Sequence, residues 1–199
     1  KDASSEMIDA LASNSHSTKH FHLPLQSGSD NVLKRMNRHY DKARYLSIVD
    51  ELKSKIKDVT FTTDIIVGFP GETEEDFQQT YDLLARLKPS FLHIFPFSER
   101  PGTPAVDMPN KVPSYISTQR VARLEELSNA LHYDFCAQGV GKEMDVLFES
   151  TMRGGMMYGY TGNYIRVKAP YRRDLINRVC RVKLSSIGED CDVVAEILE

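Results

Sequence analysis

Apolar residues recur with two different periods along residues 1–138, and each period predicts one kind of element. Alternation of every second residue is typical of a strand, whereas a period of about 3.6 residues places an apolar stripe on a helix. The expected strands are 19–26, 59–67 and 90–97. The expected helices are 4–14, 30–38, 41–56 and 73–87. Alternating strands and helices predict βαβ units, and therefore a parallel sheet with right-handed crossovers.

Several of these segments carry apolar side chains on one side, which is expected to be buried. Those on the inward faces are Phe21, Leu23 and Leu25 of the first strand, Met7, Ile8 and Leu11 of the first helix, and Phe77, Tyr81, Leu84 and Leu87 of the fourth helix. Thr73 is expected to cap that fourth helix, and the acids at 74–76 suit the positive end of its dipole.

A change of pattern near residue 139 predicts a second domain. A Pro-rich loop (98–113) leads to a long helix that starts at Pro113 and is expected to end near Gly139. Five short strands separated by Gly and Asn turns follow, at 143–150, 156–161, 163–169, 177–186 and 191–199. Short strands at such spacing are typical of a small β-barrel or sandwich. We therefore expect two domains, 1–138 and 139–199.

The first domain is expected to be incomplete. Three β/α units are too few to cover both edges of a parallel sheet, and the sequence begins within a helical pattern. We therefore expect the chain to be the carboxy-terminal part of a longer protein. The edge of its first strand is then expected to associate with a second copy of the chain.

The formal net charge of -3 conceals a local excess of positive charge. Residues 153–183 hold eight basic residues and one acid, Asp174, whereas 184–199 hold five acids and no base. The basic residues are Arg153, Arg166, Lys168, Arg172, Arg173, Arg178, Arg181 and Lys183. Such a stripe is either a phosphate-binding face or ordinary solvated surface charge.

Other features of the sequence exclude several classes of protein. No apolar run reaches the ~20 residues of a membrane span, and the first residues have no signal-peptide pattern. The three cysteines, Cys136, Cys180 and Cys191, are far apart, so they form neither a disulfide framework nor a metal-ligand motif. We expect a reducing, cytoplasmic setting in which each cysteine is a packing residue.

Three loops follow the expected strands, and in parallel β/α barrels such loops carry the functional residues. Their sequences are LQSGSD (25–30), VGFPGE (67–72) and FPFSERPGTPA (95–105). Each contains glycine, proline or small polar residues, which let a ligand approach the backbone closely. Tight-turn chemistry is the alternative explanation for any one of these loops.

Four motifs in order resemble one family. FHLPLQSGSDNVLKRMNRHY, TTDIIVGFPGETEEDF and HIFPFSERPGTPA are similar to consecutive segments of the methylthiotransferase branch of the radical S-adenosylmethionine enzymes. GYTGNYIRVKA (159–169) resembles the family's TRAM domain, an OB-like RNA-binding barrel. The motifs are most similar to the threonylcarbamoyladenosine tRNA methylthiotransferases. The resemblance implies the last strands of an open, partial TIM-like β/α barrel, followed by a small all-β barrel.

The resemblance also implies residues for S-adenosylmethionine. Gln26 and Asp64 match the positions that hold the ribose in several enzymes of the superfamily, and Arg38 matches the residue that takes the methionine carboxylate. Polar amide and carboxylate groups suit ribose hydroxyls, and the arginine fork suits a carboxylate. The other expected cofactor contacts are Ser27, Ile66, Gly68 and Phe97.

Each assignment has a structural alternative. Asp64 is otherwise a strand-end residue bonded to a backbone amide, Arg38 an exposed cation at a helix end, and Phe97, like Phe95, a core residue. Glu72 is interpreted as no more than the neighbour of the following helix. His22, His39 and His93 show no ligand spacing and are interpreted as structural or substrate-facing residues.

For the second domain the resemblance implies RNA binding. Basic side chains would contact phosphates, and tyrosine rings would stack on unpaired bases. The expected contacts are Arg153, Tyr160, Tyr164, Arg166, Lys168, Arg172 and Arg173. A barrel whose tyrosines, including Tyr158 and Tyr171, lie only in the core is the alternative.

The sequence departs from the family at one essential motif. The CxxxCxxC run that would hold the [4Fe–4S] cluster is absent, and the three cysteines match none of the family's ligands. We therefore expect the two [4Fe–4S] clusters of the full-length enzyme to be missing from this chain, which would then be inactive alone and hold no catalytic residue.

The resemblance implies methylthiolation of N6-threonylcarbamoyladenosine at C2, beside the tRNA anticodon. The expected ligands are S-adenosylmethionine and the anticodon stem-loop, with no membrane partner. Three alternatives remain: isopentenyladenosine tRNA as the substrate, a ribosomal protein as the substrate, or a non-catalytic RNA-binding module.

Overall fold

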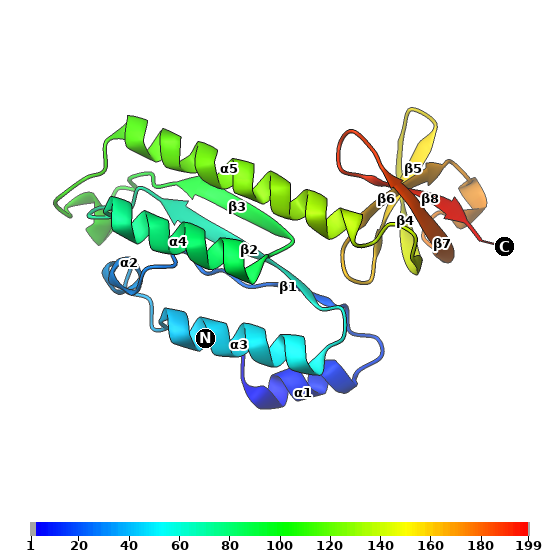
Figure 1. Ribbon diagram of the computed structural model, residues 1–199, viewed down its shortest axis with the longest axis horizontal. Helices are drawn as coiled ribbons and strands as arrows, with labels where there is room; N and C mark the ends of the chain where they lie inside the picture. Colours follow the sequence, from blue (N-terminus) through cyan, green and yellow to red (C-terminus); the bar gives the residue numbers. More distant parts are fainter. Residues whose placement is uncertain (1–2, 199) are drawn as a thin grey trace. The chain divides into compact units, whose positions relative to one another are not determined.

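The computed structural model describes residues 3–198 of the chain. It divides into two compact units (Figure 1). Unit 1 contains residues up to Ser17 together with Phe21–Leu131. Unit 2 contains Thr18–His20 and residues from His132 onward, so the division falls within one long helix. We describe each unit by itself.

A three-stranded sheet forms the centre of unit 1. Its strands are β1 (His20–His22), β2 (Thr60–Val67) and β3 (Phe91–Pro96), in that order. Strands β2 and β3 are parallel, with Asp64 opposite His93 and Ile66 opposite Phe95. An isolated parallel bridge joins Gln26 to Ile65 beyond the end of β1. The predicted parallel sheet is therefore confirmed.

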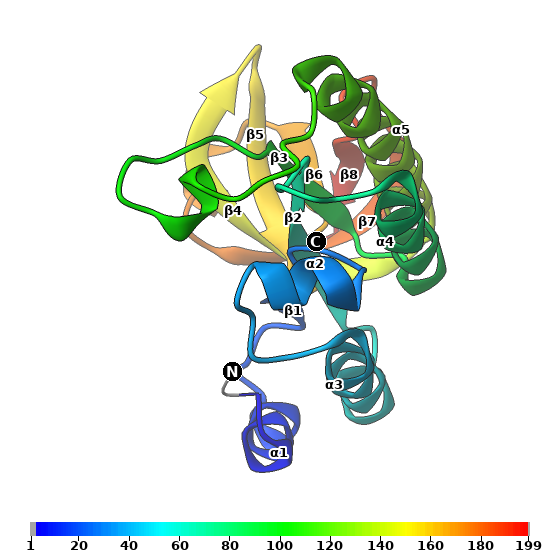
Figure 2. The same cartoon turned by 90° about the vertical axis from the view of Figure 1, so that its left-hand side faces the viewer.

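Helices cover one face of this sheet, as the view in Figure 2 shows. The helices of the chain are α1 (Ser5–Ser13), α2 (Asp30–Arg35), α3 (Lys42–Lys55), α4 (Glu74–Leu87) and α5 (Ser114–Ala137), with a short 3₁₀ turn η1 (Pro104–Val106) after β3. Phe77 and Leu84 of α4 and Leu124 of α5 pack on Ile65 and Val67 of β2. These contacts form the main core of unit 1.

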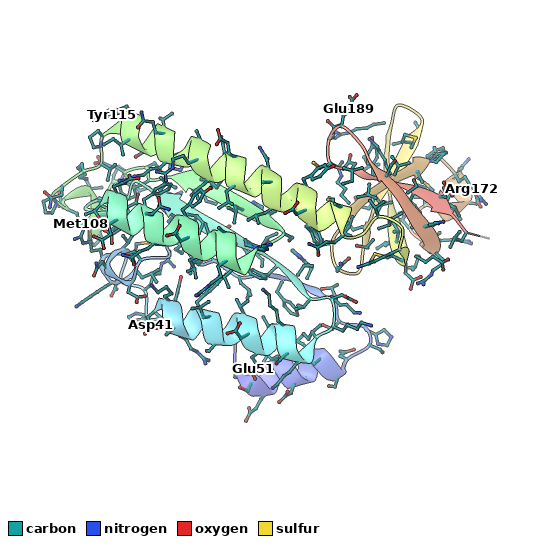
Figure 3. The ribbon with its side chains drawn as sticks, viewed as in Figure 1. Asp41, Glu51, Met108, Tyr115, Arg172 and Glu189 are labelled. Atoms are coloured by element: carbon teal, nitrogen blue, oxygen red, sulfur yellow. The ribbon has the colours of Figure 1, made fainter. Side chains whose placement is uncertain are left out.

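Local sequence explains where these helices begin. Thr73 caps α4: its hydroxyl accepts from the Asp76 amide, and the Asp76 carboxylate accepts from the Thr73 amide in return. This reciprocal arrangement satisfies two backbone donors that would otherwise lack partners. Asp41, labelled in Figure 3, caps α3 by accepting from the Arg44 amide.

Three predicted details of unit 1 are wrong. The first strand ends at His22 instead of residue 26, because Pro24 has no N–H and Gln26 adopts φ 68°. The helix predicted over 30–38 ends at Arg35, and Asn37 follows at φ 55°. On α1, Ile8 is buried as expected, but Met7 is 41% exposed.

Unit 2 is a closed five-stranded barrel. Its strands are β4 (Glu143–Arg153), β5 (Met156–Thr161), β6 (Arg166–Pro170), β7 (Val179–Ile187) and β8 (Val193–Ile197), with a 3₁₀ turn η2 (Arg173–Leu175) between β6 and β7. The order around the barrel is β4-β5-β6-β8-β7, in which β6 and β8 are parallel. Buried side chains such as Phe148, Met157 and Val167 fill the interior.

The third strand of unit 2 begins later than the sequence predicts. The pattern placed it at 163–169, but β6 begins at Arg166. Thr161 and Tyr164 form a turn there, in which Tyr164 has φ 74° and its amide donates to the Thr161 carbonyl. Across residues 3–198, no helix combines the length and hydropathy that a bilayer span requires.

Candidate functional site

The sheet of unit 1 has one face covered by helices and one that is less covered. On β2, Thr63, Ile65 and Val67 are buried under the helices. The alternate residues, including Asp64 and Ile66, point to the opposite face because successive strand side chains change sides. Phe95 of β3 is half exposed. This second face, which we call the open face, therefore presents polar and aromatic groups to a ligand.

A cleft of about 590 Å³ lies against the open face and the loops that follow the strands. Its walls include Gln26, Met36, Arg38, Asp64, Ile66, Phe69, Phe95, Pro96, Phe97, Ser98, Arg100, Thr103 and Ala105. Five of the seven residues predicted to bind the cofactor thus line one cleft, although they are spread over 72 positions of sequence, from Gln26 to Phe97. The cleft combines apolar walls with few polar groups, as small-molecule sites do.

Gln26 and Arg38 meet across this cleft. The Arg38 Nη2 donates to the Gln26 Oε1 at 3.2 Å. The backbone of Gln26 is bonded to β2 on both sides, through its N–H to the Asp64 carbonyl (2.8 Å) and its carbonyl to the Ile66 N–H (2.9 Å). A glutamine at φ 68° is strained, and these two bonds hold it in that conformation. These hydrogen bonds therefore fix the positions of the Gln26 amide and the Arg38 guanidinium at the cleft.

Asp64 is held by a side chain from the neighbouring strand. Its Oδ2 lies 3.2 Å from the Nε2 of His22, and its side chain is 25% exposed. The alternative in which the carboxylate caps a backbone amide has no support in these contacts. The second carboxylate oxygen remains on the open face, where hydroxyl groups of a ligand would reach it.

Two of the predicted cofactor residues do not line the cleft. The Ser27 hydroxyl is buried against α4, 3.3 Å from the Thr80 Oγ1, and accepts from the Ser29 amide. Gly28 also donates to Thr80, and a Cβ at Gly28 would lie 2.6 Å from the Thr80 Cα. These contacts anchor the loop at 26–29 to α4 and turn Ser27 away from the cleft.

Gly68 supports the cleft from behind. It has φ 78°, and a Cβ there would collide with the hydroxyl of Ser117 on α5. Glycine is therefore required both by the backbone conformation and by the close approach of α5. Its neighbour Phe69 does line the cleft, and its ring meets that of Phe97 edge to face at 5.1 Å between centroids.

Glu72 has a larger role than that of a neighbour of α4, which is all that the sequence indicates. Its carboxylate is buried and pairs with Arg120 of α5, Nη1 to Oε1 at 2.7 Å. The same oxygen accepts from the Gly68 amide at 3.1 Å, so it closes the loop at 68–72 on itself. We call this set of contacts the Glu72–Arg120 clamp. Burial raises the pKa of Glu72, while the Gly68 amide and Arg120 favour its charged form.

A sequence signal for the clamp did exist. Arg120 stands four residues before Leu124, so it shares the buried stripe of α5. A charged residue on such a stripe needs a buried partner of opposite charge. Glu72, in the loop packed against that stripe, is the partner.

In unit 2, three of the seven predicted RNA contacts, Tyr160, Arg166 and Lys168, lie on the outer face of β5 and β6. Tyr158 lies opposite Lys168, and Tyr160 opposite Arg166. The Arg166 guanidinium lies over the Tyr158 ring at 5.0 Å. Two tyrosines on β5 therefore face two basic side chains on β6. We call this set the tyrosine–arginine face.

A stack of three rings borders that face. The ring of Tyr164 stacks on Tyr160 (4.6 Å between centroids, 22° between planes) and on His20 (4.4 Å, 13°). Tyr164 is 51% exposed. The alternative in which the tyrosines of unit 2 lie only in its core is therefore wrong for Tyr164. Burial raises the pKa of Tyr160, an effect that Arg166 opposes, so the phenol stays neutral near pH 7.

The remaining basic residues are not all part of one stripe. Arg172, labelled in Figure 3, pairs with Asp174 at 2.7 Å in the η2 region beside Arg173. Arg181 of β7 pairs with Asp145 of β4 at 3.3 Å. Arg153 lies at the end of β4, next to the turn that leads into β5. Only part of the basic sequence therefore borders the tyrosine–arginine face, and some of its charge is neutralised within the unit.

Cys136 is poorly suited to hold an iron–sulfur cluster. Clusters are held by several thiolates. Cys136 is buried in the core of unit 2, and burial raises the pKa of its thiol to about 11. In the part of the chain that the structure describes, the one group arranged to hold a metal ion contains no cysteine.

Comparison with known proteins gives consistent relationships. Residues 2–84 match the model of the Radical SAM superfamily. Threonylcarbamoyladenosine tRNA methylthiotransferase MtaB of Bacillus subtilis is 37% identical over 187 residues, covering 92% of this chain and 42% of the relative. The MtaB of Thermotoga maritima is 38% identical over 190 residues, covering 96% and 43%. A tRNA-2-methylthio-N(6)-dimethylallyladenosine synthase of Thermoanaerobacter sp. X514 is 46% identical over 149 residues, covering 75% and 32%.

Among solved structures, the coproporphyrinogen III oxidase HemN of Escherichia coli, a radical SAM enzyme, superposes with a TM-score of 0.54. The identity is 14%, and the match covers 93% of this chain and 44% of HemN, so this likeness concerns the fold alone. The chain spans about two fifths of the length of the MtaB relatives. The resemblance to the methylthiotransferase branch of the radical S-adenosylmethionine enzymes is confirmed.

Proposed function

Because this chain is a relative of the radical S-adenosylmethionine tRNA methylthiotransferases, we propose that it forms the carboxy-terminal part of such an enzyme. Unit 1 would bind S-adenosylmethionine, and unit 2 would bind the tRNA. The observation that carries the proposal is the meeting of Gln26, Arg38 and Asp64 in one cleft.

The chemistry of the cleft suits each part of the cofactor. The ribose hydroxyls would bind the Asp64 carboxylate and the Gln26 amide, and the methionine carboxylate would bind the Arg38 fork. Ile66, Phe69 and Phe97 would form an apolar surface beside the adenine. Ser27 and Gly68 would act indirectly, because they fix the loops that carry Gln26 and Phe69. The Glu72–Arg120 clamp would be a positioning device of the same kind.

The cluster chemistry belongs to residues outside these positions. A [4Fe–4S] cluster would supply the electron that cleaves S-adenosylmethionine, and its cysteine ligands, like those of the second cluster, would come from a part of the enzyme not represented here. This chain would then orient the cofactor and exclude water. Alone, it would be inactive.

Unit 2 would act as a TRAM-type, OB-like domain. Oligonucleotide-binding barrels of this kind use the face of their second and third strands and the adjoining loops. In unit 2 these strands are β5 and β6, which carry the tyrosine–arginine face. The tyrosines would stack on unpaired bases of the anticodon loop, while Arg153, Lys168 and Arg173 would contact phosphates.

We propose N6-threonylcarbamoyladenosine beside the anticodon as the substrate, methylthiolated at C2. The support is the similarity of HIFPFSERPGTPA and GYTGNYIRV to that branch. The second candidate is dimethylallyladenosine tRNA, because relatives named for either substrate match over more than nine tenths of the chain. A tRNA substrate would place the protein in the cytoplasm, which is the setting we propose.

Mass spectrometry of tRNA nucleosides tests the function. In a strain that lacks the gene for this protein, we expect 2-methylthio-threonylcarbamoyladenosine to disappear and its precursor to accumulate. The intact gene should reverse both changes. If the dimethylallyl nucleoside changes instead, the substrate is dimethylallyladenosine tRNA. If no tRNA nucleoside changes, the proposal that the protein acts on tRNA is refuted.

Variants of the restored gene test the site. Arg38→Ala and Asp64→Asn should each fail to restore the modification, because each removes a proposed contact with the cofactor. The matched control is Arg86→Ala, which removes an exposed arginine of α4 outside the cleft. Full activity of both site variants would refute the proposed site without refuting the function.

A further inference from the structure

We propose that His22, Asp64 and His93 form a binding site for one divalent transition-metal ion on the open face of unit 1. This inference goes beyond the proposed function, which assigns no metal to these residues. The three residues come from three neighbouring strands, β1, β2 and β3.

Their ligand atoms already lie close together. One nitrogen from each histidine and one carboxylate oxygen of Asp64 all lie within 4.8 Å of one another. The His22 Nε2 and the Asp64 Oδ2 are 3.2 Å apart. Two ligands of a tetrahedral zinc ion, each about 2.1 Å from the metal, are about 3.4 Å apart. The His22–Asp64 pair therefore matches one edge of such a site, and the His93 nitrogen, which lies within 4.8 Å of both atoms, would move closer to become the third ligand.

The backbone holds these residues in position. Asp64 and His93 face each other in the β2–β3 register, so their side chains leave the sheet on the same side. The Leu23 amide donates to the Thr62 carbonyl at 2.9 Å, which fixes the end of β1 beside β2. Ligands placed on strands are more precisely oriented than ligands on loops.

Thr62 gives His22 the orientation of a metal ligand. The His22 Nδ1 lies 3.0 Å from the Thr62 Oγ1. In the tautomer whose Nδ1–H donates to this hydroxyl, the unprotonated Nε2 presents its lone pair toward the carboxylate oxygen of Asp64, and a cation can bind between them. Metal-bound histidines characteristically donate their other N–H in this way. In the other tautomer Nε2–H donates to Asp64, and a metal ion would displace that proton.

The donor set selects the class of metal. Two imidazoles and one carboxylate suit zinc, iron(II), cobalt(II) or nickel(II), whereas magnesium and calcium prefer oxygen ligands alone. The side chains of His22 and Asp64 are 46% and 25% exposed, so an ion would keep positions for water or another ligand. Asp64 also belongs to the proposed cofactor cleft, so the ion and the ribose would compete for its carboxylate.

Cobalt(II) and zinc(II) are suitable probes, because cobalt has visible absorption bands and zinc displaces it. The untagged chain is freed of metal with a chelator and titrated with cobalt(II) at neutral pH. We expect one equivalent to bind and to be displaced by zinc(II). His22→Asn and His93→Asn should each weaken binding at least tenfold, and Thr62→Val should weaken it by about tenfold through the lost support of His22.

The control is His16→Asn, which removes an exposed histidine from the loop after α1 and should bind as the unmodified chain does. Circular dichroism of the metal-free variants shows that they fold, and His93→Gln replaces His93→Asn if that variant does not. Equal binding by the His22 and His93 variants would overturn the proposal, as would no binding at micromolar cobalt. A thiolate-to-cobalt band in the near ultraviolet would assign the ion to cysteine and also overturn it.

Discussion

The two candidate binding surfaces are built in different ways. The cleft of unit 1 lies where strands end, and its polar groups depend on a strained glutamine, a glycine under α5 and a buried ion pair. The tyrosine–arginine face of unit 2 consists of outward side chains on two strands of a closed barrel. Its core, with residues such as Met157 and Val167, lies on the other side of the same strands.

Because of this difference, we expect folding stability and ligand binding to be coupled in unit 1 and largely independent in unit 2. In unit 1 the groups that shape the cleft are also buried packing groups, so changing them should alter both properties. In unit 2 the alternation of strand residues assigns binding to one face and packing to the other. Substitutions on the outer face should therefore change affinity with little effect on folding.

The largest expected effect is in unit 1. Glu72→Gln removes the buried charge that pairs with Arg120 and leaves the guanidinium with Glu74, an exposed carboxylate, as its remaining ion-pair partner. Breaking a buried ion pair costs about 3–5 kcal/mol, and because Glu74 still pairs with Arg120 we expect the lower end, about 3 kcal/mol. Urea unfolding followed by hydrogen-exchange mass spectrometry, which observes the helices of unit 1 separately, measures the loss.

The double variant Glu72→Leu/Arg120→Met is the control, because two apolar side chains leave no unpaired charge. It should recover much of the stability. It should nevertheless bind S-adenosylmethionine more weakly than the unmodified chain, because the hydrogen bond from the Gly68 amide to the Glu72 carboxylate is lost. A single variant as stable as the unmodified chain would contradict the role given to the clamp.

The second effect is on binding by unit 2. Tyr164→Ala should weaken binding of an anticodon stem-loop RNA by about 1–3 kcal/mol, the usual contribution of one stacked base. The melting temperature should change little, because this side chain is half exposed. Fluorescence anisotropy with labelled RNA measures the affinity. Tyr133→Ala, at an exposed tyrosine of α5, is the matched control, and equal losses in both variants would argue against a specific face.

A smaller effect concerns pH and the anchoring of the cleft loop. Burial of Asp76 raises its pKa, but bonds from Ser29 and Thr73 outweigh this, so the pKa of the folded state lies below the ordinary value of 3.8. A lowered pKa stabilises the fold above the unfolded value, and the contribution disappears as the pH falls through the folded value. At pH 7 we expect Asp76→Asn to lose about 1 kcal/mol.

Unfolding of the unmodified chain and of Asp76→Asn between pH 7 and pH 2 tests this assignment. The difference in unfolding free energy should be constant down to about pH 5 and should shrink below it. A difference that is independent of pH would mean that the carboxylate charge does not contribute.

The smallest effect compares the cysteines of unit 2. Cys136 is fully buried and its pKa is raised to about 11, whereas Cys180 and Cys191 are partly exposed. Iodoacetamide at pH 8 should therefore modify the native chain at Cys180 and Cys191 before Cys136. Intact-mass and peptide analysis measures the order. Equally fast modification of Cys136 would show that the core of unit 2 opens readily.

The sequence predicted the parts of the fold that depend on periodic patterns. The parallel sheet, the α4 cap at Thr73 and the buried stripe with Phe77 and Leu84 follow from local chemistry. The pattern failed where backbone conformation is irregular, as at Gln26 and Tyr164, because left-handed residues other than glycine carry no clear composition signal.

For the cofactor site, the resemblance predicted residues that do meet, Gln26 with Arg38, from twelve positions apart. It did not predict that the Ser27 side chain turns toward α4, because this depends on Thr80, a residue more than fifty positions away. The cluster of His22, Asp64 and His93 was also missed. Residues on separate strands have no sequence spacing, and only the register of the sheet brings them together.

The spacing of side chains along β5 also limits which RNA conformations can bind. Tyr158 and Tyr160 leave the strand on the same side, about 6.8 Å apart, because each strand residue advances the chain by about 3.4 Å. Neighbouring bases in a duplex are separated by half that length, about 3.4 Å. Two consecutive bases can stack on these two rings only if they have first separated from each other. The spacing of the strand therefore favours a splayed single-stranded loop and disfavours a helix.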